Sequence, residues 1–140
     1  MRIGIIIGRI GGVDGVALET EKWIDILKKL GHEVFIMSGE FDSWDMDYEH
    51  DYLFSALSFF SVEAEWGQRK AFFEPDKDPG PLLDHVETAS NMIYEAMLQW
   101  VADKKIDAIL SENASALPCH LSMGVAIKKL IEHTGLPIVT

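Results

Sequence analysis

Four glycines and an arginine near the start of the chain could bind a small anion. Gly8, Gly11, Gly12 and Gly15 fall within eight residues, and Arg9 lies among them. Because glycine has no Cβ atom, backbone N–H groups in such a loop can approach an anion closely. A guanidinium group can add paired hydrogen bonds to a carboxylate or a phosphate. We therefore expect a phosphate or carboxylate site, with a simple tight turn and a surface arginine as the alternatives.

The elements on either side of this loop would place it at a ligand-binding position. Residues Arg2–Gly8 form a β-branched run that is typical of a central strand in a parallel sheet. Residues Val16–Leu30 form an amphipathic helix, with Asp14 as its N-cap and Gly31 as its left-handed C-terminal residue. Open α/β sheets bind their ligands between the carboxyl end of a strand and the amino end of a helix.

Two known phosphate-binding fingerprints are absent from this loop. Ile10 stands where the second glycine of G-x-G-x-x-G would fall, and no G-K-[ST] follows. If this loop binds phosphate, it must therefore do so through a motif other than these two.

Strands and helices are expected to alternate along the rest of the chain. The expected strands are Glu33–Met37, Leu53–Phe60, Ile106–Leu110 and Leu136–Val139; the expected helices are Val62–Phe73, Leu82–Lys104 and Leu121–His133. The first helix should pack by one stripe, formed by Val16, Thr20, Trp23, Ile24, Leu27 and Leu30. This alternation predicts an α/β, Rossmann-like three-layer domain with a mostly parallel sheet.

An acidic segment follows the second strand. Six carboxylates alternate with aromatic residues between Glu40 and Tyr52, and we expect this segment on the ligand side of the sheet. It could be a solvated loop held by its aromatic residues or a divalent-metal site, because spacing alone does not show whether the carboxylates converge. We predict no metal here.

Composition narrows the class of protein. The chain has 140 residues, a net charge of −11 and a single cysteine, Cys119. Long-range repulsion disfavours nucleic acids and anionic membranes as partners, and no internal disulfide can form. No signal-peptide or membrane-spanning segment is recognised, so we expect a cytoplasmic protein.

The last expected strand ends with the chain. We therefore expect residues 1–140 to be one domain of a longer protein, truncated at its carboxyl end, and its open edge strand to favour self-association.

The chain resembles the amino-terminal domain of GT-B glycosyltransferases of family 4. Gly11-Gly12 followed by Leu30-Gly31-His32-Glu33-Val34 is similar to the opening of that group. Glu112-Asn113-Ala114, with Pro118 and His120 ahead of Met123-Gly124-Val125-Ala126, resembles a subset that includes enzymes making mannosylglucosylglycerate-type solutes. Many relatives have a histidine where this chain has Ser111.

The resemblance implies a retaining enzyme that moves a sugar from a nucleotide sugar to a small, acidic acceptor. Its amino-terminal domain would hold the acceptor, while the nucleotide sugar and the catalytic acidic pair would belong to a second domain that is absent here. It implies a nucleotide sugar as co-substrate, no further cofactor and no required metal. This chain alone should be inactive.

The resemblance also implies a set of substrate-binding residues: Arg9, Gly11, Gly12, Asp14, Glu112, Asn113 and His120. Glu112 and Asn113 could instead cap the following helix, and His120 could be a local structural histidine. A rival hypothesis from another class is a stand-alone flavodoxin-like or phosphate-binding module without catalysis.

Overall fold

The computed structural model describes all 140 residues and has the predicted α/β architecture. Its main sheet has five parallel strands in the order β5-β3-β1-β6-β7. The strands are β1 (Arg2–Ile7), β3 (Glu33–Ser38), β5 (Asp51–Leu53), β6 (Ala108–Glu112) and β7 (Ile138–Val139). Strand order reverses direction between β1 and β6, which is where open α/β sheets form a ligand crevice.

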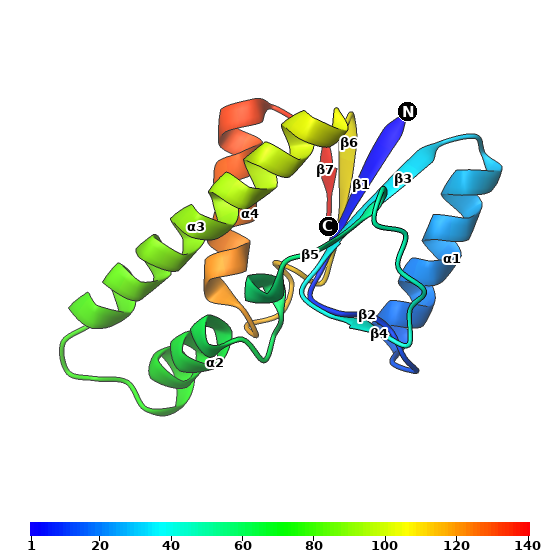
Figure 1. Cartoon of the computed structure of the whole chain (residues 1–140). Helices are drawn as coiled ribbons and strands as arrows, with labels where there is room; N and C mark the ends of the chain where they lie inside the picture. The colour runs from blue at the N-terminus through cyan, green and yellow to red at the C-terminus, as the bar shows by residue number, and fades with distance from the viewer.

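Helices cover both faces of this sheet, as Figure 1 shows. Helix α1 (Gly15–Lys29) lies on one face, where Ile24 joins a core with Ile5 and Ile36. Helices α3 (Gly80–Lys104) and α4 (Leu121–Thr134) lie on the other face, in a larger core that includes Ile6 and Phe35. The three-layer prediction is therefore confirmed.

The first β-α-β unit agrees closely with its prediction. Asp14 caps α1, and Gly31 has a φ of 83°, the left-handed conformation expected of it. The predicted packing stripe is wrong at two positions, because Trp23 is 43% exposed and Leu30 is 68% exposed. Ala17 is buried instead, so the helix is rotated relative to the expected stripe.

The prediction of a strand at Leu53–Phe60 is wrong. Only Leu53 belongs to a strand, and residues Ser55–Leu57 form a short 3-10 helix (η1). This apolar run meets the core through a turn, with Leu57 fully buried and Phe54 and Phe59 packed against the same cluster.

The second half of the chain follows the predicted order with shifted boundaries. Helix α2 (Val62–Gln68) continues into a π-helical turn, η2 (Arg69–Phe73), before α3 begins at Gly80. Strand β6 begins at Ala108, two residues after its predicted start, and Gly135 ends α4 with a φ of 66°.

A second, two-stranded sheet was not predicted. Strand β2 (Ile10–Gly11) pairs in parallel with β4 (Phe41–Asp42), directly beyond the carboxyl ends of β1 and β3. The segment after β4 then runs back along the sheet, because His50 contacts Glu33 at the beginning of β3 and Asp47 in turn contacts His50. The expectation that the whole acidic segment lies on the ligand side is therefore wrong.

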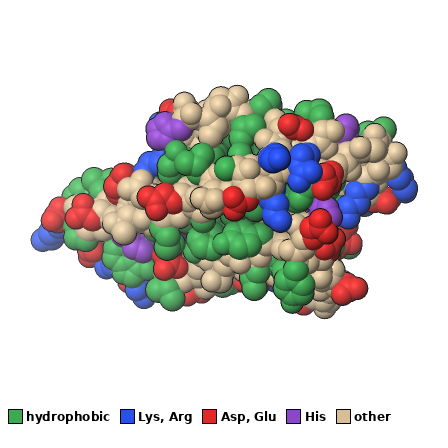
Figure 2. Space-filling view, turned by 45° about the horizontal axis from the view of Figure 1, so that its top comes forward, with side chains coloured by type: hydrophobic (Ala, Val, Ile, Leu, Met, Phe, Trp, Pro, Cys, Tyr) green, Lys and Arg blue, Asp and Glu red, His purple; other side chains and the backbone are tan.

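Charged side chains of both signs share the surface. In the face shown in Figure 2, basic side chains lie beside acidic ones. None of the helices combines the length and the apolar character that a membrane crossing requires.

Candidate functional site

A pocket of about 200 Å³ lies at the point where strand order reverses. It is bounded by Ile7 at the end of β1 and by Asn113 just after β6. Its other lining residues are Arg9, Asp14, Val16, Glu40, Phe59, Phe60 and Leu117. An apolar wall with a few convergent polar groups at this edge of the sheet is the usual composition of a small-molecule site.

Arg9 and Asp14 form an ion pair in this pocket. Nη2 of Arg9 lies 2.7 Å from Oδ2 of Asp14, while Oδ1 of Asp14 accepts hydrogen bonds from the backbone nitrogens of Val16 and Ala17. The bond from Ala17 and the contact with Arg9 lower the pKa of Asp14, and the bond to Asp14 raises the pKa of Arg9. Asp14 is therefore ionised and held from two sides.

This arrangement changes the expected role of the helix terminus. Two of the backbone N–H groups that a helix leaves free at its start are already bonded to Asp14. The amino end of α1 therefore offers an anion fewer donors than the sequence led us to expect.

Gly11 and Gly12 make a close turn against β4. Their φ angles are 85° and 75°, and a Cβ atom on Gly11 would lie 1.7 Å from the backbone oxygen of Asp42. A Cβ atom on Gly12 would lie 2.9 Å from Oδ2 of the same residue. Neither glycine lines the pocket, so their placement favours the alternative of a tight turn.

The structure adds Glu40, Phe59 and Phe60, which the sequence did not suggest as site residues. Two glycines make room for this part of the pocket. A Cβ atom on Gly8 would lie 2.8 Å from the ring of Phe59, and one on Gly39 would lie 2.1 Å from the backbone nitrogen of Ser58. Each of these glycines comes directly after a strand of the sheet, and that position was the signal in the sequence that could have located this wall of the pocket.

Glu112 and Asn113 diverge. Asn113 has a φ of 53° and lines the pocket. Glu112 lies outside the pocket lining, and its pKa is raised by burial and by the charge of Glu19 on α1. Of these two predicted residues, only Asn113 therefore lies at this pocket.

His120 is buried, with 2% of its surface exposed, and both ring nitrogens are occupied. Its Nε2–H donates to the backbone oxygen of Ala56 at 2.7 Å, and Nδ1 accepts from the backbone nitrogen of Met123 at 3.3 Å. His120 does not line the pocket, and these bonds favour its alternative role as a structural N-cap of α4.

The acidic segment does not gather its carboxylates. Asp51 accepts hydrogen bonds from Trp44 and from the backbone of Asp47, and no group of three or more potential metal ligands converges in the structure. An aromatic residue, Trp44, holds the segment in place, as expected for the alternative of a loop held by its aromatic residues.

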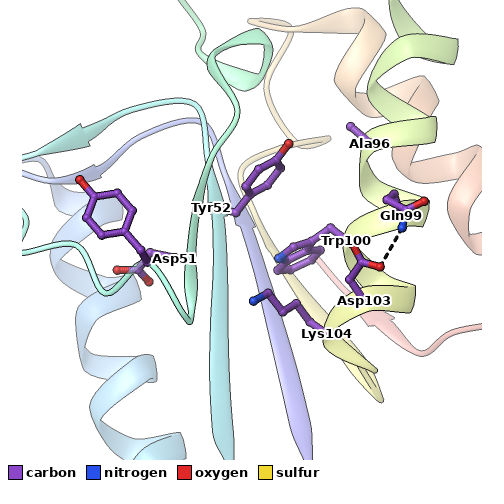
Figure 3. A pocket seen from close by; sticks show the side chains of 8 residues that line it. Asp51, Tyr52, Ala96, Gln99, Trp100, Asp103 and Lys104 are labelled. Carbon is purple, nitrogen blue, oxygen red and sulfur yellow. Dashed lines mark hydrogen bonds between the residues drawn. The ribbon is translucent and has the colours of Figure 1, made fainter.

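A second cavity, of about 240 Å³, lies between the edge strand β5 and the last turns of α3 (Figure 3). Tyr52 and Trp100 line it together with polar groups. Gln99 donates to Asp103 at 2.7 Å, and Lys104 donates to the backbone oxygen of Glu49 at 2.6 Å. This cavity lies at the edge of the sheet, away from the reversal of strand order, so the pocket between β1 and β6 is the better candidate.

Two curated proteins are similar to this chain. Mannosylglucosylglycerate synthase of Thermotoga maritima is 29% identical over 137 residues, which cover 93% of this chain and 29% of that protein. Mannosylglucosylglycerate synthase of Petrotoga mobilis is 22% identical over 144 residues, which cover 99% of this chain and 31% of that protein. The chain therefore spans less than a third of the length of these relatives. No protein-family model and no solved structure matches it.

Proposed function

We propose that this chain is the amino-terminal, acceptor-side domain of a glycosyltransferase. The observation that carries the proposal is the similarity to two proteins named mannosylglucosylglycerate synthase, which extends over 93% and 99% of the chain. The pocket at the reversal of strand order supports it, because that is where this kind of sheet binds small molecules.

We further propose the GT-B architecture of family 4 and a retaining transfer from a nucleotide sugar to a small acceptor of the glycerate type. Since the relatives are more than three times as long as this chain, a second domain that binds the nucleotide sugar fits their length. The acidic pair that contacts the donor would belong to that domain.

In this proposal the pocket orients the acceptor. Holding a hydroxyl close to the anomeric carbon replaces a bimolecular encounter with a step inside one complex. Arg9, Asp14, Glu40 and Asn113 supply charged and amide groups around one space, and Phe59 excludes water from one side of it. We assign these residues to acceptor binding, and the stabilisation of the leaving diphosphate to the other domain.

The test is a transfer assay on the full-length protein that contains this chain. Nucleoside-diphosphate sugars would be combined with glycerate, glucosylglycerate and a neutral glucoside, and the anomeric configuration of the first product would be read by NMR. We expect transfer with retention, and less than about a tenth of that rate from residues 1–140 alone. Absence of transfer with every donor would overturn the proposal.

A variant pair links the assay to the pocket. Arg9→Ala should raise the KM for the acceptor, because it removes a donor that lines the pocket and frees the charge of Asp14. Lys22→Ala is the matched control, since Lys22 and Glu19, both on α1, form an exposed ion pair of comparable length. Equal KM values in the two variants would place the acceptor elsewhere.

A further inference from the structure

The pocket between β1 and β6 carries more negative than positive charge. Arg9 is its only cationic lining residue, whereas Asp14 and Glu40 are both carboxylates. The guanidinium group is already bonded to Asp14, and the charges of Glu40 and Asp42 also act on it. An anion entering the pocket would therefore compete with Asp14 for Arg9 and be repelled by the other carboxylates.

Glu40 is held in position with one carboxylate oxygen available. Its backbone oxygen accepts hydrogen bonds from the backbone of Ile10 at 3.0 Å and from the hydroxyl of Ser38 at 2.7 Å. Its Oε1 accepts a hydrogen bond from the buried hydroxyl of Ser58. No side chain of the protein donates to Oε2 of Glu40, so this rigidly supported residue can accept a hydrogen bond from a ligand.

The remaining walls suit the ring of a sugar. Phe59 and Phe60 offer aromatic surface, and the exposed side chain of Leu117 faces the same space. Asn113 adds an amide that can both donate and accept. Sugar hydroxyls also donate and accept, so they match a mixture of carboxylates, an amide and a guanidinium better than an anion or a cation does.

We propose that this pocket binds the hydroxyl-rich ring of a sugar, not the carboxylate or phosphate of a substrate, and that Glu40 sets this preference. The inference rests on the proposed function for the identity of the sugar-bearing acceptor. It revises the expectation from the sequence, which placed a carboxylate or phosphate against Arg9. An acidic acceptor would then enter with its hydroxyl-rich end in the pocket and its carboxylate outside.

Binding of small probes to the full-length protein tests the inference independently of turnover. Methyl α-D-glucopyranoside, D-glycerate and inorganic phosphate would each be titrated, with the side-chain amide resonance of Asn113 as the reporter. We expect the glucoside to shift this resonance at concentrations at least about tenfold below those needed for either anion. Tighter binding of glycerate or phosphate would overturn the inference.

The variant Glu40→Gln keeps the shape of the side chain and an oxygen for Ser58 but removes the charge. It should weaken glucoside binding about tenfold, because a hydrogen bond to a charged acceptor becomes a neutral one, and strengthen phosphate binding. Asp45→Asn is the matched control: Asp45 is an exposed carboxylate of the same segment, outside the pocket lining, and its loss should leave the order of the three probes unchanged.

The outcomes separate the two proposals. If the wild-type protein transfers sugar but Glu40→Gln binds all three probes as the wild type does, the inference about Glu40 fails and the proposed function stands. If the glucoside binds as expected but no donor supports transfer, the pocket preference stands and the proposed function fails.

Discussion

The imidazole of His120 links η1 to the first turn of α4, since its Nε2 atom lies 2.7 Å from the backbone oxygen of Ala56 and its Nδ1 atom accepts from the backbone of Met123. These partners assign the neutral tautomer with hydrogen on Nε2. A second proton, on Nδ1, would point at the N–H group of Met123. Burial lowers the pKa of His120, although the bond to Ala56 and the charge of Glu63 oppose the shift.

The first prediction follows from the direction of this shift. Because the pKa of His120 is lower in the folded state, the unfolded chain takes up a proton first, and stability should fall as the pH drops below about 6.5. His120→Asn keeps an acceptor for Met123 and cannot be protonated, so its thermal midpoint should change less between pH 8 and pH 5. The other four histidines are common to both proteins, so an identical pH dependence would contradict the prediction.

The second prediction concerns Asp14. Asp14→Ala should cost about 1 kcal/mol of unfolding free energy, because two backbone N–H groups of α1 lose their acceptor. Asp14→Asn should cost less, since asparagine caps helices about as well and loses only the ion pair with Arg9. Urea unfolding of the three proteins at pH 7 measures both values, and equal losses would mean that the cap contributes nothing.

The pH dependence of the same residue has a defined sign. The folded-state pKa of Asp14 is lowered, so its stabilising contribution is present above the unfolded value of about 3.9 and is lost as the pH falls through the folded one. The difference between wild type and Asp14→Ala should therefore shrink in acid.

Much of the fold was predictable because its elements have local causes. The β-branched residues of β1 favour a strand by themselves, and the N-cap residue and the glycine after α1 mark the two ends of that helix. Strands β2 and β4 have two residues each and exist only through the pairing of Ile10 with Phe41, a contact between distant segments. The wrong strand at Leu53–Phe60 has the same origin, since a continuous apolar run fits a buried turn as well as a buried strand.

The candidate site was predictable only in part. Arg9 and Asn113 closely follow the ends of β1 and β6, Asp14 immediately precedes α1, and all three line one pocket. Glu112 lies outside this pocket, since side chains alternate along a strand and that of Glu112 lies close enough to α1 to feel the charge of Glu19. Glu40 was missed because it opens a segment that reads as a solvated acidic loop.

The third prediction compares two glycines of the same loop. Gly11→Ala should cost several kcal/mol, on the order of 3, because its Cβ atom would overlap the backbone of Asp42 and its φ is 85°. Gly15→Ala is the matched control: no atom lies within 4 Å of its Cβ position, and it begins α1, so alanine should be neutral or stabilise by about 0.5 kcal/mol. Chemical unfolding should give very different unfolding free energies for the two variants. Similar values would mean that the turn against β4 can relax.

The last prediction concerns Glu112, whose pKa is raised by burial and by Glu19. A raised folded-state pKa means that the proton-bound form fits the fold better, so the related stability is present below about pH 4.3 and is lost as the pH rises through the folded value. At neutral pH the ionised carboxylate therefore weakens the fold. Glu112→Gln should raise the unfolding free energy by a few tenths of a kcal/mol at pH 7, a small gain because the side chain keeps part of its contact with solvent.

The gain from Glu112→Gln should vanish near pH 4, where the wild-type side chain is also neutral. Glu19→Gln is the matched control, because it removes the negative charge on α1 that repels Glu112 and should recover part of the same gain at pH 7. Thermal unfolding from pH 4 to pH 8 gives both comparisons. If Glu112 also binds substrate, the stabilised variant will lose transfer activity in the full-length protein; a variant that is less stable at pH 7 would show that the carboxylate makes a favourable contact in the fold.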